Sequence, residues 1–380
     1  MEVLIFTIPI ITCIILFVWF FERTVWWEYC VVIAPSIILY FFLKYAMISY
    51  STSATEYWGG YVTSTIYYED WDEMVLVHKT RQVYDGTDSE GRPKYRTEHY
   101  TEWERRYHPE CWAYTDNRGK WEHSISKSMF NYINDKLKAQ PVFKDMHRNY
   151  HRIDGDAYIR HYNGNPKNCY TLTWEHTYEN RVKASDHSIF KFHDLSGKEI
   201  KYYGLYDYPK IVNLDQNPII GKKVPYEHEN AIRYINAYYG GKKQIRVFIL
   251  LYNSPNILIG EMQRSHWLGG NKNEFVVCLG VDKHNNVMWC YPFSWEDKPK
   301  LAVETKQYFI DNPKLDIGKY SKFLTSHLKD WKRKEFKDFE YISVELSDVQ
   351  LTWIIILIII YNICISIWVV KNEFWYYNYY

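Results

Sequence analysis

The chain has almost no net charge: its 380 residues include 46 Lys and Arg against 45 Asp and Glu, a formal balance of +1. A near-neutral protein has no bulk electrostatic attraction for nucleic acid, so no nucleic-acid partner is expected. The chain also lacks a Cys-x-x-Cys pair and a glycine-rich phosphate loop, which leaves no indication of a zinc ribbon or of a bound nucleotide cofactor. No Asn-x-Ser/Thr acceptor occurs either, as expected of a chain that does not enter a glycosylating compartment.

Hydrophobic residues are concentrated at the two ends of the chain. Residues 3–21 and 351–370 contain no charged side chain, and residues 29–50 contain only Lys44. A helix needs about 20 apolar residues to cross the roughly 30 Å of hydrocarbon in a bilayer. The pattern predicts three transmembrane helices: a hairpin of two within 1–50 and a third over 351–370. The alternatives are a signal peptide for the first run and a buried core helix for the last; Glu2 in place of a basic start disfavours the signal peptide.

Basic residues near the ends of the apolar runs predict the orientation. Residues 329–337 (KDWKRKEFK) precede the third run, whereas the N-terminal hairpin contributes only Arg23 and the C-terminal tail only Lys371. Because basic flanks stay in the cytoplasm, we expect an integral membrane protein with residues 51–350 cytoplasmic. The same basic stretch is suited to contact with anionic lipid, so the lipid bilayer is the first expected partner.

The middle of the chain predicts an α+β fold in two domains. Residues 51–200 are expected to form a strand-rich α+β domain, because Thr, Tyr and Val dominate runs such as 61–68, 74–77 and 94–101, with turn residues around 85–93. Residues 201–345 are expected to form an α/β domain around the apolar strands 245–251 and 274–281. Helices are expected after Ser126, after Pro225 and over 301–310 and 319–337, with Gly240 and Gly241 ending the second.

Several phrases resemble those of a known group of proteins. They are TEYWGGY at 55–61, YHPECW at 107–112, HRNYHRIDGD at 147–156, EHTYENRV at 175–182, YGLYDYP at 203–209 and GGNKNEFVVC at 269–278. Together they resemble uncharacterised membrane-anchored proteins of large tailed bacteriophages and of some bacteria. The resemblance implies a phage origin and a bacterial inner membrane, with host-envelope or phage proteins as partners, and it implies no mechanism.

Residues 226–340 are faintly similar to a second family, the TPM domain. The likeness lies in the order helix, apolar strand, WLGG at 267–270, then strand, turn and strand. In that family a lumenal or periplasmic placement is common, which opposes the orientation expected from charge. A likeness of fold brings no catalytic residues with it.

The best candidate for chemistry is a group of histidines and aspartates. His147 and His151 are four residues apart, so on a helix they would share a face and could bind one metal ion. Asp154 or Asp156 would complete the site, with His176 from the next strand-like run. The structural interpretation is that these side chains are scattered on a solvated surface, since a chain with 14 His produces such spacings by chance.

Two functions follow as hypotheses. The first is a membrane-tethered interaction protein without enzymatic activity, suggested by the lack of a catalytic motif and by many Tyr and Trp, which favour protein contacts. The alternative is a metal-dependent hydrolase that uses the His/Asp group within 147–187.

Overall fold

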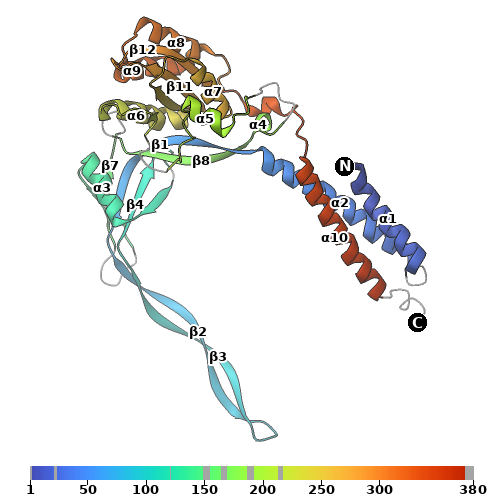
Figure 1. Ribbon diagram of the computed structural model, residues 1–380. Coiled ribbons are helices and arrows are strands. Elements are labelled where there is room, and N and C mark those ends of the chain that lie inside the picture. The colour runs from blue at the N-terminus through green and yellow to red at the C-terminus, as the bar shows by residue number, and fades with distance from the viewer. Residues whose placement is uncertain are drawn as a thin grey trace.

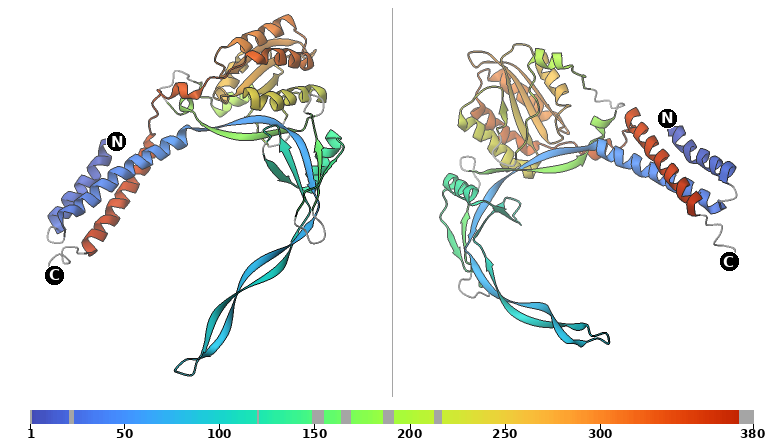
Figure 2. Two further views of the ribbon diagram at one scale, coloured as in Figure 1. Left: turned by 180° about the vertical axis from the view of Figure 1, so that it is seen from behind. Right: turned by 60° about the horizontal axis from the view of Figure 1, so that its bottom comes forward.

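The computed structural model describes residues 2–20, 24–119, 121–148, 155–163, 169–185, 192–212 and 217–372. It is a mixed α+β structure in four parts: a helical bundle, a bent sheet, a two-stranded arm and an α/β unit (Figure 1). The bundle and the arm project from the rest as two separate extensions, and both slope in the same general direction in all views (Figures 1 and 2).

The bundle contains α1 (Glu2–Phe20), α2 (Trp26–Thr52) and α10 (Asp348–Asn372). The helices α2 and α10 are long and apolar enough to cross a membrane, and the described part of α1 is a shorter apolar helix. Antiparallel packing of α2 and α10 brings Asn362 Nδ2 to 3.0 Å from Ser36 Oγ, with both side chains buried. A polar contact of this kind between apolar helices holds their register.

The strand β1 (Ser53–Tyr68) follows α2 without a loop and organises the bent sheet. Its first half pairs with β8 (Thr171–Glu179), and its second half pairs with β4 (Cys111–Asp116) and β7 (Ala157–His161). The short strands β5 (Glu122–Ile125) and β6 (Val142–Lys144) extend the sheet, α3 (Lys127–Leu137) covers it, and α4 (Arg181–Ala184) follows β8. Ser126 caps α3 as its sequence predicts, since its hydroxyl accepts a hydrogen bond from Met129 N.

The arm is a single hairpin of β2 (Trp71–Thr87) and β3 (Pro93–His108), and it extends from the bent sheet with no other element beside its tip (Figure 1). Apart from their mutual pairing, neither strand packs extensively against another described element. The turn lies where Asp, Gly and Pro predict it, but both strands are much longer than the runs 74–77 and 94–101.

The α/β unit has a four-stranded sheet in the order β12-β11-β10-β9. The parallel strands are β9 (Ile219–Ile220), β10 (Arg246–Tyr252) and β11 (Glu274–Val281), and β12 (Val287–Ser294) is antiparallel. Helices α6 (Tyr226–Lys243), α8 (Lys300–Asp311) and α9 (Ile317–His327) cover one face, and α5 (Gly197–Tyr203) and α7 (Leu258–His266) the other. The central strands β10 and β11 are completely buried, as expected of the apolar runs 245–251 and 274–281.

Two helix predictions are wrong. Gly240 and Gly241 do not end α6, which continues to Lys243 and ends where Gln244 adopts a left-handed conformation. Gly240 serves packing instead, because its missing side chain permits close contact with the backbone of Gly59 in β1. The helix expected over 319–337 ends at His327; short 3₁₀ turns follow at Leu328–Asp330 and Phe336–Phe339. Between these turns the backbone is extended and pairs with residues 295–297, since Lys334 N donates to Trp295 O and Asp297 N to Lys332 O.

Candidate functional site

The residues expected to bind a metal ion are only partly described. His151 and Asp154 lie outside the described residues. His147 is not in a helix: it has a positive φ of 48°, and its exposed ring lies 3.0 Å from Asp145. The Asp156 carboxylate accepts a hydrogen bond from Met146 N. Within the described ranges, no group of three or more His, Cys, Asp or Glu side chains could hold a metal ion.

The segment around His147 contributes to the root of the arm. Arg148 donates a hydrogen bond to Gly155 O, and its guanidinium lies 4.9 Å from the centre of the Trp71 ring. Trp71 in turn stacks on His108 at 4.1 Å, so the first residue of β2 and the last of β3 are fastened together. His147 and Asp156 therefore lie beside the root of the arm. His176 is not with them, because β8 places it opposite Glu56, near the other end of β1.

The arm has two chemically different faces. Side chains alternate between the faces of a strand, so the pairing register assigns each residue to one face. One face, here called the aromatic face, contains the cross-strand pairs Leu76 with Trp103 and Tyr84 with Tyr95. Trp103 is 61% exposed, and Tyr84 and Tyr95 are each 57% exposed. The polar pairs between them are uncharged or histidine-containing: His78 with Thr101, Thr80 with His99, and Gln82 with Thr97.

The opposite face of the arm carries most of its charges, whereas the ion pair of Asp72 with Arg105 is on the aromatic face at the root of the arm. Lys79 Nζ lies 3.0 Å from Glu102 and also pairs with Glu104, and Arg81 Nε lies 2.8 Å from Glu98. Exposed ion pairs of this kind contribute little to stability but keep a surface hydrated. The large hydrophobic side chains of the arm that are more than a third exposed are all on the aromatic face, where no other described element covers them, whereas Tyr100 on the charged face is partly buried.

A second cluster lies where β1 meets the α/β unit. The Glu56 carboxylate is completely buried, and Arg333 Nη1 donates to both of its oxygens at 2.8 and 3.0 Å. Lys272 Nζ is 3.3 Å and His176 Nδ1 is 3.1 Å from the same carboxylate. A buried carboxylate needs such partners, because the loss of water is otherwise uncompensated. Arg333 thereby connects the segment before α10 to β1.

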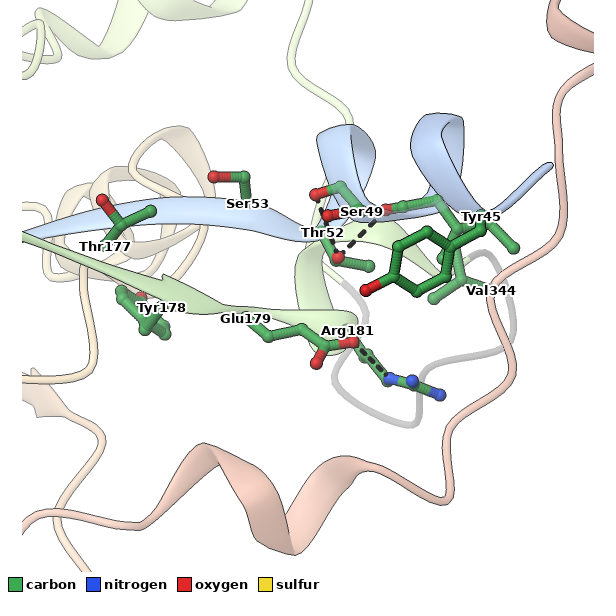
Figure 3. A pocket seen from close by; sticks show the side chains of 10 residues that line it. Tyr45, Ser49, Thr52, Ser53, Thr177, Tyr178, Glu179, Arg181 and Val344 are labelled. Atoms are coloured by element: carbon green, nitrogen blue, oxygen red, sulfur yellow. Dashed lines mark hydrogen bonds and ion pairs between the residues drawn. The ribbon is translucent and has the colours of Figure 1, made fainter. Parts of the chain in front are cut away.

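Three hollows adjoin one another around this cluster. The strand-end hollow, of about 520 Å³, lies where α2 continues into β1 (Figure 3). Its lining side chains include Tyr45, Ser49, Thr52, Thr177, Glu179 and Arg181, and the last two form an ion pair. A middle hollow shares Tyr178, Glu179 and Arg181 with it. The middle hollow in turn shares Lys272, Phe336 and Lys337 with a third, here called the basic hollow.

Burial changes the proton affinities of the side chains between these hollows. Burial lowers the pKa of Lys272, although the nearby Glu56 carboxylate opposes the shift. Burial likewise raises the pKa of the Tyr178 hydroxyl, whose ring lies 4.2 Å from Lys272 Nζ. Both shifts show that charge is costly at this position, so a charged group that is retained here must have a partner.

The chain matches no protein-family model, no curated protein and no solved structure. The phage resemblance and the likeness to the TPM domain therefore stay predictions, and so does the hydrolase hypothesis.

The arm and the Glu56 cluster were not identified from the sequence as sites. The composition of the runs 74–77 and 94–101 predicted strands, but a strand prediction does not reveal whether a strand face is covered. For Glu56, the only local indication was a lone carboxylate within a strand-forming segment, which is unfavourable unless it is paired.

Proposed function

We propose that this protein is a membrane-anchored interaction protein that uses the aromatic face of its arm to bind a partner protein. The observation that carries the proposal is the exposure of Leu76, Trp103, Tyr84 and Tyr95 on a hairpin with no covering element among those described. An isolated two-stranded ribbon is only marginally stable in water, and large aromatic side chains are the usual anchors of protein interfaces. A partner sheet or helix would bury these rings and stabilise the arm.

The surface chemistry of the helical bundle supports anchoring. Only 17% of the most apolar window of α2 and 22% of that of α10 are buried, so these are not core helices of the kind that a soluble protein hides. Outward-facing side chains such as Ile38, Phe42 and Ile363 are more than half exposed. A contiguous apolar surface of this kind suits lipid. With α1 as a third span, the arm and the α/β unit lie on one side of the membrane.

The expected host and side of the membrane extend the proposal. The basic residues before α10 favour a cytoplasmic position for 51–350, and the phage resemblance favours a bacterial inner membrane. In that setting the partner is a host-envelope or phage protein that presents an apolar surface. Because most charges of the arm are on the opposite face, and Asp72 and Arg105 on the aromatic face pair with each other, we expect this association to persist at high salt.

Site-specific photo-crosslinking tests the proposal with a matched control. Tyr95 and Tyr100 are on the same strand, but Tyr95 belongs to the aromatic face, whereas Tyr100 pairs across to Lys79 on the charged face. Each tyrosine is replaced in turn by benzoylphenylalanine, in the full chain in its native membrane. We expect one discrete crosslinked product from position 95 and none from position 100. The result should be unchanged in about 0.5 M salt, which screens exposed charges.

Two crosslinking results would contradict the proposal. Equal crosslinking from both positions, or none from position 95, would show that the aromatic face does not bind a protein. Replacing Leu76 and Trp103 by Ser should abolish the product from position 95 while leaving the amount of folded protein in the membrane unchanged, since neither side chain packs on the rest of the chain.

A further inference from the structure

The basic hollow contains far more cations than carboxylates. Its volume is about 490 Å³, and its lining includes one carboxylate, Glu335. The six cationic side chains that line it are Lys242, Lys243, Lys272, Lys332, Arg333 and Lys337. They come from the last turn of α6, the loop before β11 and the extended segment before α10, so the fold brings them together from three parts of the sequence.

The carboxylates near these cations do not neutralise them. Lys337 pairs with Glu335 at 2.5 Å and Lys332 with Asp297 at 3.7 Å, while Arg333 and Lys272 share the single charge of Glu56. Lys243 donates to the backbone carbonyl of Lys329 rather than to a carboxylate. In these ion pairs, four of the six cations meet three carboxylates, and Lys242 and Lys243 add two further positive charges.

Trp331 and Gln244 are the uncharged polar side chains of the lining. Trp331 is only 5% exposed and lines the basic hollow, and its indole Nε1 has no acceptor among the described residues. A buried N–H without an acceptor costs free energy unless a ligand or water supplies one. Gln244 contributes the only neutral acceptor side chain of the lining, and Arg333 Nε already uses its Oε1 at 2.6 Å. The lining thus has many more side-chain donors than acceptors, the acceptors being Glu335, which pairs with Lys337, and Gln244.

We propose that the basic hollow binds the phosphate group of an anionic ligand, held by Lys242, Lys243 and Arg333. A phosphate presents several acceptor oxygens and up to two negative charges, which matches the surplus of donors and positive charge. The hydrogen bonds from Arg333 Nη1 to both oxygens of Glu56 hold the guanidinium in place before a ligand binds. The ligand also compensates the cost of keeping Lys272 charged in a buried position.

Two sources could supply this phosphate: a phospholipid headgroup or soluble phosphate. The adjoining hollows favour the headgroup, because they lead from the end of α2 through Arg181 and Lys337 to the basic hollow. Only the headgroup source rests on the membrane anchoring proposed above. The phosphate site itself does not depend on the arm or on its partner.

The test uses the full chain, purified in neutral detergent without phosphate. Native mass spectrometry measures the retention of added dioleoylphosphatidylglycerol or dioleoylphosphatidylcholine, and calorimetry measures the binding of inorganic phosphate. The variant Lys242→Gln with Lys243→Gln removes two exposed or half-exposed charges of the hollow. The control, Lys319→Gln with Lys322→Gln, removes two exposed charges from α9, outside the hollow.

We expect the hollow variant to bind about tenfold more weakly, since each lost charge-assisted hydrogen bond has a large effect, and the control variant to bind like the parent. Selective retention of phosphatidylglycerol identifies a headgroup site, and tight binding of inorganic phosphate with the same dependence on Lys242 and Lys243 identifies a soluble phosphate. The proposal is overturned if neither ligand binds, or if the two double variants weaken binding equally. Crosslinking from position 95 is independent of every one of these results.

Discussion

Glu56 shows how one buried side chain can join distant parts of a chain. It is on β1, yet its partners are His176 on β8, Lys272 before β11 and Arg333 before α10. Removing one member of a buried ionic group is expensive, because the charges left behind have neither a partner nor water. The stability of the packing between β1, β8 and the segment before α10 therefore depends on this single carboxylate.

We predict that Glu56→Gln lowers the free energy of unfolding by about 3 kcal/mol, since Arg333 and Lys272 would stay buried without a negative charge. Thermal unfolding of the full chain in detergent measures the loss. The control is Glu175→Gln, the same change at an exposed carboxylate that precedes His176 on β8. We expect this variant to lower the free energy of unfolding by less than about 0.5 kcal/mol. Equal melting temperatures for the two variants would contradict a structural role for the buried cluster.

At the scale of elements, the closest contact is between β1 and α6. A Cβ added at Gly240 would lie 2.7 Å from Gly59 N, and one added at Gly59 would lie 1.9 Å from Asn236 O. Both positions therefore need glycine for reasons of space. The neighbouring Gly241 is different, because its added Cβ would meet Gly59 O at an ordinary 3.4 Å.

These adjacent glycines form a matched pair for mutagenesis. We predict that Gly240→Ala destabilises the protein by about 1–3 kcal/mol, because α6 must move away from β1. Gly241→Ala should be neutral or stabilising by up to about 1 kcal/mol, since alanine favours the helix and meets no close atom. Denaturant unfolding of both variants gives the comparison. If both substitutions stabilise to the same degree, the helix is not held as closely against the strand as the distances indicate.

The elements also show why some sequence predictions succeeded. The strands β10 and β11 and the start of α3 were predicted correctly, because continuous apolar runs and a serine cap are local properties. The helix expected over 319–337 was wrong, because Trp331, Phe336 and Phe339 are buried from extended or 3₁₀ backbone rather than along a helical stripe. The helical spacing of apolar residues could not reveal that the backbone of 332–334 pairs with residues 295–297 instead.

At the scale of the whole molecule, the bundle determines which parts share a side of the membrane. The end of α2 and the start of α10 are adjacent, since Gln350 Nε2 donates to Ser51 Oγ, and the first turn of α1 lies at the same end of the bundle (Figure 2). The C-terminal end of α10 lies at the other end. Three spans would therefore place the arm and Lys371 on opposite sides.

We predict that Ser89→Cys at the tip of the arm and Lys371→Cys at the end of α10 are labelled from opposite sides. In intact cells, a membrane-impermeant maleimide mass tag should add one label to the Lys371→Cys chain, relative to the parent, and none to the Ser89→Cys chain. Permeabilised cells should label both. Labelling of Ser89→Cys alone in intact cells would reverse the orientation, and labelling of both would contradict three spans.

The sequence by itself determined the features that depend on neighbouring residues: the apolar terminal helices, the turn of the arm, the buried strands and the caps. Only the tertiary structure decided which faces are covered and which charges meet. The aromatic face of the arm is exposed because no other described element reaches it, and Glu56 is paired because the fold brings Arg333 to it from 277 positions away. Such contacts depend on topology and register, which short-range patterns of hydrophobicity and turn formation do not encode.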